Sequence, residues 1–368
     1  MKTRLFLLFA LSLVLFSCEE NGDEPWNPNT KDVTILARCI DSNNTVFVMS
    51  TKDGVIADMV VNTEGSIGGI YNYNGQPWVW IKNGNRYQMC RFDHGNLADS
   101  KDVSFLDDYT GGKWWGWAPR VFDSNILFGG INEEDKVFMI FDSNGSPTQY
   151  PLSNINLDDY KTENGSFSRS TFYAIDGYSN FFCANLINNE KLIVEKNGQK
   201  LWEDNCSSLS RIEVVGQDLY VLGSYNGKGA YWVNGRRVVD DKLSAISSVC
   251  SLNGTLCLGG YTTDEHKVQR ATMKVGDRYY DLTDELDWYG YRDPSTGEGL
   301  GKHSCVVKMI VENNEIFAQV TKYNQVSPYL AGDGVYVMPH SDAIFRNDRK
   351  VMDMGDKRIS SFAVITQE

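Results

Sequence analysis

The sequence predicts an all-β protein, a β-propeller of seven blades with about four antiparallel strands each, and three observations lead to this fold. First, the stretch 210–239, SRIEVVGQDLYVLGSYNGKGAYWVNGRRVV, holds four short apolar runs separated by turn residues. Two of its turns are Asn226-Gly227 and Asn234-Gly235. Asn-Gly between apolar runs favours a tight hairpin, because both central residues of a type I′ turn need positive φ. The unit is therefore predicted to be a four-stranded meander.

The second observation is that the turn recurs, and the third is that small residues end a strand upstream of most turns. The turns lie at Asn83-Gly84, Asn144-Gly145, Asn197-Gly198, Asn234-Gly235, Val275-Gly276 and Asn347-Asp348. The small pairs are Gly68-Gly69, Gly129-Gly130, Gly223-Ser224 and Gly259-Gly260. The two shortest intervals between turns are 37 residues, from Asn197 to Asn234, and 41 residues, from Asn234 to Val275. A repeat near forty residues is typical of a propeller blade.

The N-terminal segment is predicted to be an export signal. Lys2 and Arg4 precede an apolar run, residues 5–16, that fits a signal sequence and is too short to span a bilayer. Residues 1–17 are therefore assigned to the signal, and residues 18–32, which are acidic and contain two prolines, to a flexible tether.

The remaining residues, 33–368, are predicted to form one propeller domain. Residues 33–50 supply two strands without a complete blade, and ISSFAVI, residues 359–365, supplies a lone strand. An unpaired edge favours aggregation, so we expect the two chain ends to share one blade, with the C-terminal strand innermost. Six further blades, of which the first begins near Val55 and the second near residue 119, bring the number to seven; six or eight also fit the pattern.

Two resemblances suggest a location. Leu15-Phe16-Ser17-Cys18 resembles the bacterial lipobox, which implies lipidation of Cys18, and Glu19-Glu20 resembles the acidic export tag of Bacteroidetes surface lipoproteins. The blades resemble kelch-type repeats and, with runs such as YWVNG at 231–235, propeller lipoproteins of Bacteroidetes. These resemblances imply an outer-membrane protein held by its lipid anchor, exposed at the cell surface or facing the periplasm.

Charge and metal-binding residue types exclude several functions. The formal net charge of −13 disfavours binding to nucleic acid. Seven cysteines follow Cys18 without CxxC spacing, and the four histidines show no ligand spacing and are predicted to be exposed in loops, so we expect neither a metal nor a cofactor. Cys250 and Cys257 are predicted to face each other across a hairpin. Two buried thiols are favoured there over a disulfide, although an oxidising compartment would favour the disulfide.

Three long insertions are predicted to emerge on one face of the ring, between the last strand of one blade and the first of the next. They are residues 107–118, 151–169 and 284–304. Two of them are rich in aromatic rings and acids, which suit the apolar faces and the hydroxyls of a sugar. The candidate ligand-binding residues are Trp114, Trp115, Trp117, Asp287, Trp288, Tyr289, Tyr291 and Asp293. The alternative is that these rings only fasten their own loops to the blades.

The leading hypothesis is a lipid-anchored, non-catalytic module of the cell envelope that binds a glycan or a partner protein through this loop-rich face. No catalytic residue is assigned, because no nucleophile elbow, phosphate-binding loop or metal motif is present in the sequence. One alternative is a glycoside hydrolase or lyase that uses loop carboxylates such as Asp107 and Asp108. Another is a structural subunit of an envelope complex.

Overall fold

The computed structural model describes a chain of β-strands. The residues described are 32–40, 46–52, 55–59, 65–93, 96–109, 114–122, 125–132, 134–152, 171–265, 268–283, 291–292, 299–300, 302–325, 337–355 and 357–366. For 46–52, 55–59, 114–116, 291–292, 299–300, 302, 323–325 and 337–341 only the backbone is described. Within these ranges one short 3-10 helix occurs, η1 (Ser104–Tyr109). No helix in the described part of the chain is both long enough and apolar enough to cross a membrane.

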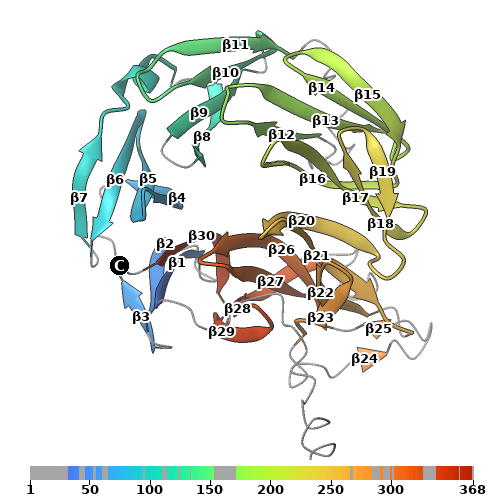
Figure 1. Cartoon of the computed structure of the whole chain (residues 1–368). Helices are drawn as coiled ribbons and strands as arrows, with labels where there is room; N and C mark the ends of the chain where they lie inside the picture. The colour runs from blue at the N-terminus through green and yellow to red at the C-terminus, as the bar shows by residue number, and fades with distance from the viewer. Residues whose placement is uncertain are drawn as a thin grey trace, which may run out of the picture.

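Six four-stranded antiparallel sheets, each made of consecutive strands, follow one another around a ring (Figure 1). Blade 1 is β4 (Ser66–Tyr73), β5 (Gln76–Asn83), β6 (Arg86–Asp93) and β7 (Asn96–Lys101); blade 2 is β8 (Trp114–Phe122), β9 (Asn125–Asn132), β10 (Val137–Phe141) and β11 (Pro147–Pro151). Blade 3 is β12 (Thr171–Ile175), β13 (Phe181–Ile187), β14 (Lys191–Lys196) and β15 (Gln199–Asn205); blade 4 is β16 (Ser208–Val215), β17 (Asp218–Tyr225), β18 (Lys228–Val233) and β19 (Arg236–Val239). Blade 5 is β20 (Ala245–Leu252), β21 (Thr255–Thr263), β22 (Gln269–Val275) and β23 (Arg278–Asp281); blade 6 is β26 (Lys302–Glu312), β27 (Glu315–Gln325), β28 (Val337–Arg346) and β29 (Arg349–Asp353).

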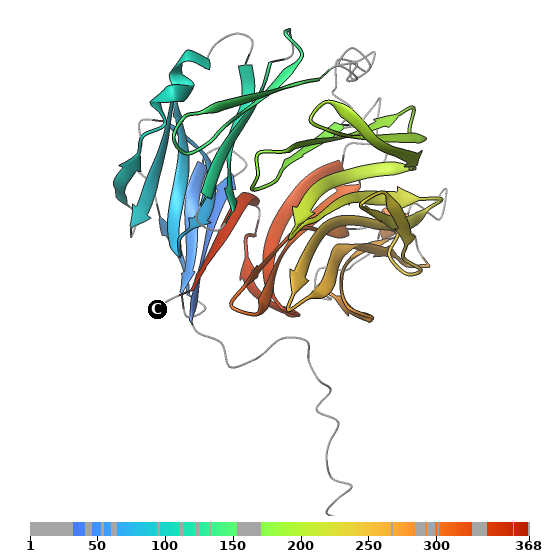
Figure 2. The same cartoon turned by 45° about the horizontal axis from the view of Figure 1, so that its top comes forward.

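The remaining four-stranded sheet, the closing sheet, joins the two ends of the chain. Its strands are β1 (Val33–Ile40), β2 (Val46–Lys52), β3 (Val55–Met59) and β30 (Arg358–Thr366), in the order β3-β2-β1-β30. Figure 2 shows β30, in red, beside the blue N-terminal strands. Since β30 contacts the first strands β4 and β26, it occupies the innermost position, as expected. The expectation that Val55 opens the next blade is wrong, because β3 pairs with β2 and so extends the closing sheet.

The prediction of an all-β propeller is confirmed. The predicted number of seven blades is wrong, and six, which the pattern also allows, is the number of blades built from consecutive strands. The seventh was to be formed by the chain ends, which instead make the closing sheet, a composite of β1, β2 and β3 with β30. Between β23 and β26 lies a small two-stranded sheet, β24 (Tyr291–Arg292) and β25 (Gly299–Leu300), which falls within the predicted insertion at 284–304.

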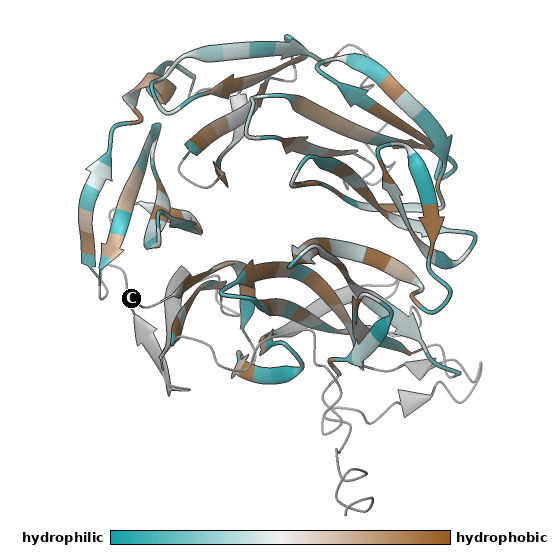
Figure 3. Ribbon diagram, viewed as in Figure 1, coloured by the Kyte–Doolittle hydropathy of each residue, from teal (hydrophilic) through white to brown (hydrophobic). Residues whose placement is uncertain are grey.

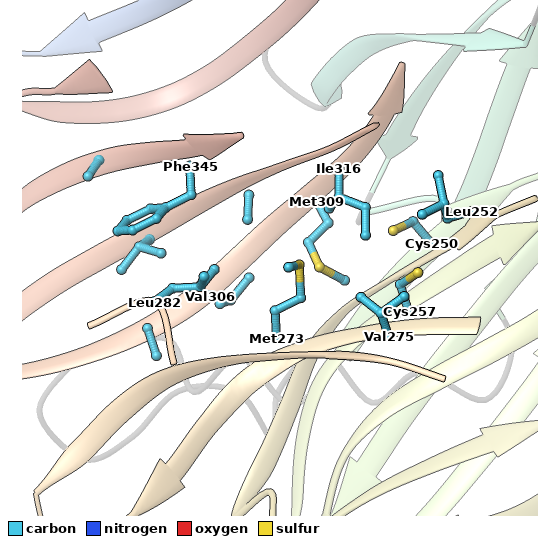
Figure 4. Close-up of a cluster of buried hydrophobic side chains, with 14 residues drawn as sticks. Cys250, Leu252, Cys257, Met273, Val275, Leu282, Val306, Met309, Ile316 and Phe345 are labelled. Carbon is cyan, nitrogen blue, oxygen red and sulfur yellow. The ribbon is translucent and has the colours of Figure 1, made fainter. Parts of the chain in front are cut away.

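The hydrophobic core is divided into clusters that lie between adjacent sheets. Between blades 5 and 6, for example, Met273 and Leu282 pack with Val306 and Met309 (Figure 4). The closing sheet packs on blade 6 through one cluster and on blade 1 through another, so hydrophobic contact continues across the junction of the chain ends. The outermost strands are largely exposed, as the hydrophilic segments of β11 and β29 illustrate (Figure 3). Burial between neighbouring sheets is therefore what holds the ring together.

The hairpin turns have the predicted backbone conformation. Both central residues have positive φ at Asn226-Gly227, with angles of 51° and 74°, and at Asn234-Gly235, with angles of 49° and 90°. Asparagine also has a second function in the turns between third and fourth strands. Its side-chain oxygen accepts a hydrogen bond from the first or second residue of the second strand in the same blade, at 2.8 Å from Phe181 to Asn197 and at 3.0 Å from Leu219 to Asn234. The turn is thereby tied to the blade interior.

A β-bulge interrupts the first strand of five blades at the same place. The bulges lie between Ile67 and Gly69, Trp115 and Ala118, Leu209 and Arg211, Ile246 and Ser248, and Val306 and Lys308. In blades 4 and 5 the backbone of the bulged strand approaches a glycine of the second strand. A Cβ atom added to Gly260 would lie 2.0 Å from the carbonyl oxygen of Ala245. This close approach explains two of the repeated glycines.

The cysteine and histidine predictions are confirmed only in part. Cys250 and Cys257 pair directly across their hairpin, and both are buried free thiols, as are the other five cysteines after Cys18. The expectation of a loop position is wrong for two histidines: His340 lies in β28, and His303 lies in β26 and is 4% exposed. Its Nδ1 accepts a hydrogen bond of 3.0 Å from the backbone N–H of Gln269, so this ring joins blades 5 and 6.

Candidate functional site

Trp117 is a core residue. A loop is predicted there from the sequence, but Trp117 lies in β8 and is 5% exposed. Its indole N–H donates to the carbonyl oxygen of Tyr109 in η1 at 3.0 Å, and its ring lies over Gly130, where a Cβ atom would approach within 2.4 Å. A ring enclosed in this way has no face left for a ligand. For Trp117 the alternative is therefore correct: the ring fastens the adjoining segment to the blade.

Within the described part of the chain, no two of the predicted ligand-binding residues are seen in contact with each other. Trp114 and Trp115 belong to β8 and Tyr291 to β24, and only their backbones are described. Asp287, Trp288, Tyr289 and Asp293 lie outside the described residues, as does Cys18 with the signal segment and the tether up to residue 31. A site on the loop-rich face remains a prediction.

Exposed apolar side chains point to a different surface. The large apolar side chains that the described part of the chain exposes most are Tyr178, at 83%, and Leu201, at 49%, followed by Ile187 and Val239. Three of these four residues belong to blade 3, and the fourth lies in blade 4. Tyr178, in the turn before β13, and Leu201, near the start of β15, lie at the same end of blade 3, whereas Ile187 ends β13 at the other end.

Tyr178 and Leu201 line a pocket of about 600 Å³ between blades 3 and 4. Its apolar lining consists of Tyr178, Phe182, Leu201, Trp202, Val214 and Leu219, and its polar lining of Asp176, Asn180, Lys196, Gln217 and Asn234, with Gly177 and Gly216. In blades 3 and 4 these residues lie in the turn between the first and second strands, in the turn between the third and fourth strands, and at the strand ends beside these turns. In an antiparallel meander these turns lie opposite the predicted long insertions, so the pocket is at the other end of the ring.

The turn that carries Tyr178 is held firmly. The Oδ1 atom of Asp176 accepts hydrogen bonds from the backbone N–H groups of Tyr178 and Asn180, both at 2.9 Å. The side-chain amide of Asn180 donates to Asp176 Oδ2 at 2.7 Å and accepts at its own oxygen from Asn197. Tyr150 OH donates to the carbonyl oxygen of Ser179 at 2.7 Å. The phenol ring of Tyr178 is therefore presented to solvent on a preorganised backbone.

Trp202 forms a second aromatic wall of the pocket. It is half-buried in β15, and the turn of blade 4 rests on it, since a Cβ atom on Gly235 would lie 3.2 Å from the indole ring. The indole N–H is buried and has no hydrogen-bond partner within the described residues. Nearby, the ammonium group of Lys196 lies 5.4 Å from the centre of the Phe182 ring. The pocket thus combines aromatic faces, an ammonium group, a carboxylate and several amides.

These groups are suited to binding and not to the cleavage of a glycosidic bond. Hydrolysis of that bond usually needs two carboxyl groups at a set distance. The pocket lining contains one, Asp176, and both of its oxygens hold the turn of Tyr178. The sequence signal that was missed is the segment Asp176-Gly177-Tyr178-Ser179-Asn180, in which a large aromatic residue stands at the tip of a turn.

The comparisons with known proteins bear on the fold alone. No protein-family model matches the chain, and no curated protein matches its sequence. A variant of puromycin hydrolase is similar in structure, with 10% identity and a TM-score of 0.45 over 85% of this chain and 52% of the hydrolase. The chain therefore spans about half the length of that protein.

Two shorter proteins are also similar in structure. A streptogramin B lyase has 11% identity and a TM-score of 0.38, with 89% of this chain and 98% of the lyase covered. AofleA from Arthrobotrys oligospora has 10% identity and a TM-score of 0.37, with 84% of this chain and 91% of AofleA covered. At these identities the likeness says nothing about ligands or chemistry.

Proposed function

We propose that this chain is a lipid-anchored, non-catalytic propeller of the bacterial cell envelope, and that it binds a glycan in the pocket between blades 3 and 4. The observation that carries the proposal is Tyr178, an aromatic side chain that is 83% exposed on a fixed turn at the edge of that pocket. Tyr178 counts as an observation because it lies at the edge of a pocket with a second aromatic wall, Trp202, and not because a single exposed ring is unusual.

The chemistry of the pocket fits a sugar ring. The C–H faces of a pyranose stack on aromatic rings, here Tyr178 and Trp202, while its hydroxyl groups need hydrogen-bond partners. Lys196 and Gln217 offer such partners at the edge of the pocket. Because the turn is already ordered, binding costs little conformational entropy. A partner protein that inserts an apolar side chain beside Tyr178 is the competing kind of ligand.

The location is part of the proposal. A lipobox-like segment ending at Cys18 and an acidic tether support an outer-membrane lipoprotein of the Bacteroidetes type with kelch-like blades. The lipid on Cys18 would be the attachment to the membrane, and the tether would let the ring turn toward glycans at the cell surface. Labelling of intact cells with palmitate should mark the wild-type protein and leave the Cys18→Ala variant unmarked.

The binding function can be tested with a glycan array followed by titration calorimetry on the mature protein. We expect Tyr178→Ala to weaken the binding of a glycan by about tenfold, the effect of losing one stacking contact. Ile187→Ala is the matched control, since Ile187 is also exposed and apolar but lies at the loop-rich end of blade 3.

Three results would distinguish a glycan from a protein ligand, and the pocket between blades 3 and 4 from the loop-rich face. Loss of glycan binding in the Ile187→Ala variant and not in Tyr178→Ala would move the site to the loop-rich face. If no glycan binds and a protein is recovered whose capture depends on Tyr178, the ligand is a protein. If Tyr178→Ala changes no interaction, the pocket is not a binding site.

A further inference from the structure

Charged side chains from three blades that are not neighbours interact electrostatically near the axis of the ring. Arg120 lies in β8 of blade 2, Arg211 and Glu213 in β16 of blade 4, and Lys308 in β26 of blade 6. All these strands are the first of their blades, which lie nearest the axis (Figure 1). Lys308 interacts electrostatically with the other three residues. Since blades 3 and 5 separate blades 2, 4 and 6, these electrostatic interactions act across the centre of the ring. We call them the axial cluster.

The bulges position two of the cations. Arg211 and Lys308 are each the first paired residue after the bulge of their strand, and their positions in blades 4 and 6 are therefore equivalent. In blade 5 the same position holds Ser248, whose hydroxyl accepts a hydrogen bond of 2.8 Å from the backbone N–H of Met309. A bulge re-aims the side chain that follows it, and such irregularities are common beside functional sites.

The axial cluster has excess positive charge. Arg211 forms an ion pair of 2.9 Å with Glu213, which neutralises one of the three cations. Arg120 has no hydrogen-bond or ion-pair partner among the described residues, and the ammonium group of Lys308 lies 4.9 Å from the Phe362 ring centre and 3.4 Å from its carbonyl oxygen. This excess occurs in a chain whose net charge is −13. An ion-pair network with only a structural role would be expected to balance its charges.

The environment of Lys308 shows that the excess positive charge of the axial cluster is energetically unfavourable. Although part of the side chain is exposed, desolvation is the largest cause that lowers the pKa of Lys308, to about 8. Repulsion from Arg211 and Arg120 lowers it further, and attraction to Glu213 opposes the change. Tyr71, on the first strand of blade 1, also lies in the field of Arg120 and has a pKa raised by burial. Unfavourable charge kept in one place is typical of a functional site.

We propose that the axial cluster is a binding site for an oxyanion, the carboxylate or phosphate group of a small molecule, which Arg120, Arg211 and Lys308 hold together. A guanidinium group offers two parallel N–H donors that match the oxygens of either group, and an ammonium group adds a compact charge. The phenol of Tyr71 and the ring of Phe362 lie beside the cations and suit the uncharged part of the ligand. This site is separate from the pocket between blades 3 and 4 and does not depend on it.

Titration calorimetry at low salt tests the proposal with three probes: sodium galacturonate, inorganic phosphate and neutral galactose. We expect one or both anions to bind, and Arg120→Gln and Lys308→Met each to weaken that binding roughly tenfold or more, as the loss of a charge-assisted contact implies. Arg91→Gln is the matched control, because Arg91 pairs with Asp99 on the outer strands of blade 1. Tyr178→Ala should leave anion binding unchanged, which separates this site from the proposed glycan pocket.

Proton uptake supplies a second readout. A bound anion favours the ammonium form of Lys308, so binding near pH 8 should take up protons, seen as a dependence of the heat on the buffer's ionisation enthalpy. The Lys308→Met variant should lose this uptake. Binding of phosphate alone would identify a phosphate ligand, and binding of galacturonate alone a carboxylate. The proposal is overturned if neither anion binds, or if both anions bind Arg120→Gln and Lys308→Met as tightly as they bind the wild type.

Discussion

The side chain of Asn234, in the turn between β18 and β19, accepts a hydrogen bond of 3.0 Å from the backbone N–H of Leu219 in β17. Leu219 is only 4% exposed, so its N–H group is poorly solvated when that bond is absent. We expect Asn234→Gly, which keeps the positive φ and removes only the side chain, to reduce the free energy of unfolding by about 1 to 2 kcal/mol. Urea denaturation followed by tryptophan fluorescence measures this change.

The matched control is Asn226→Gly. Asn226 also precedes a glycine and has a φ of 51°, but its side chain makes no hydrogen bond within the part of the chain described. Its replacement should change stability by less than about 0.5 kcal/mol. Equal losses in the two variants would show that the conformation of the turn, and not the side-chain bond, sets the preference for asparagine.

Gly260 is required by the bulge in β20. We expect Gly260→Ala to destabilise the protein by about 1 to 3 kcal/mol, because the added Cβ atom lies 2.0 Å from the Ala245 carbonyl oxygen and the backbone must shift. Thermal unfolding measured by circular dichroism reports the loss. Gly177→Ala serves as control, since a Cβ atom there meets nothing closer than 3.6 Å. An unchanged melting temperature for Gly260→Ala would mean that the backbone at the bulge can shift to accommodate the methyl group without loss of stability.

Trp117 should behave as a core residue and not as a ligand-binding residue. We expect Trp117→Ala to reduce the free energy of unfolding by about 3 to 5 kcal/mol, because it empties a site packed against Gly130 and Phe141. Tyr178→Ala should change stability by less than about 0.5 kcal/mol in the same denaturation experiment. A small loss at Trp117 would return it to the set of candidate ligand-binding residues.

Asp240 should link stability to pH. It is 4% exposed, and although desolvation alone would raise its pKa, hydrogen bonds from Leu243 N–H, Lys274 and Tyr279 lower the pKa overall. The folded state therefore favours the carboxylate. Its stabilising effect is complete above the unfolded pKa, near 4, and is lost as the pH falls below it.

The corresponding test is Asp240→Asn. At pH 7 the variant should lose about 1 to 3 kcal/mol, because the buried Asp240 carboxylate accepts charge-assisted hydrogen bonds that an amide cannot replace, while Lys274 is partly solvated. Urea denaturation from pH 7 to pH 2 should show the difference between wild type and variant begin to shrink below about pH 4 and continue to shrink as the pH falls further, because the unfolded carboxyl takes up its proton before the folded one. Curves that stay parallel over that range would contradict the assignment.

The repeating elements of the fold are predictable because their signals are local. Asn-Gly turns and alternating apolar runs specify each hairpin through the backbone conformation of two or three residues, as at Asn234-Gly235. The pairing of the chain ends is also predictable, since two strands without a complete blade at one end and a lone strand at the other leave open edges that can pair with each other. The prediction of where β8 begins was wrong. The strand starts at Trp114, but the segment Trp114-Trp115-Gly116-Trp117 has the composition of a loop.

The candidate sites were not predictable because they depend on distant contacts. Tyr178 is a site residue only because blade 4 brings Gln217 and the turn of Asn234 against blade 3. Likewise, Lys308 looks like an ordinary strand lysine until Arg120 and Arg211 interact with it electrostatically near the axis. Concentrated aromatics in the sequence indicate burial as readily as binding, which is what Trp117 shows.

The pairing of β1 with β30 joins strands that are more than 300 residues apart in the sequence. Ordering so long a stretch of chain costs entropy before the contact forms, so we expect the closing sheet to assemble after the hairpins of the six blades. The folding rate of the whole domain should therefore depend on this one pairing more than on any single hairpin.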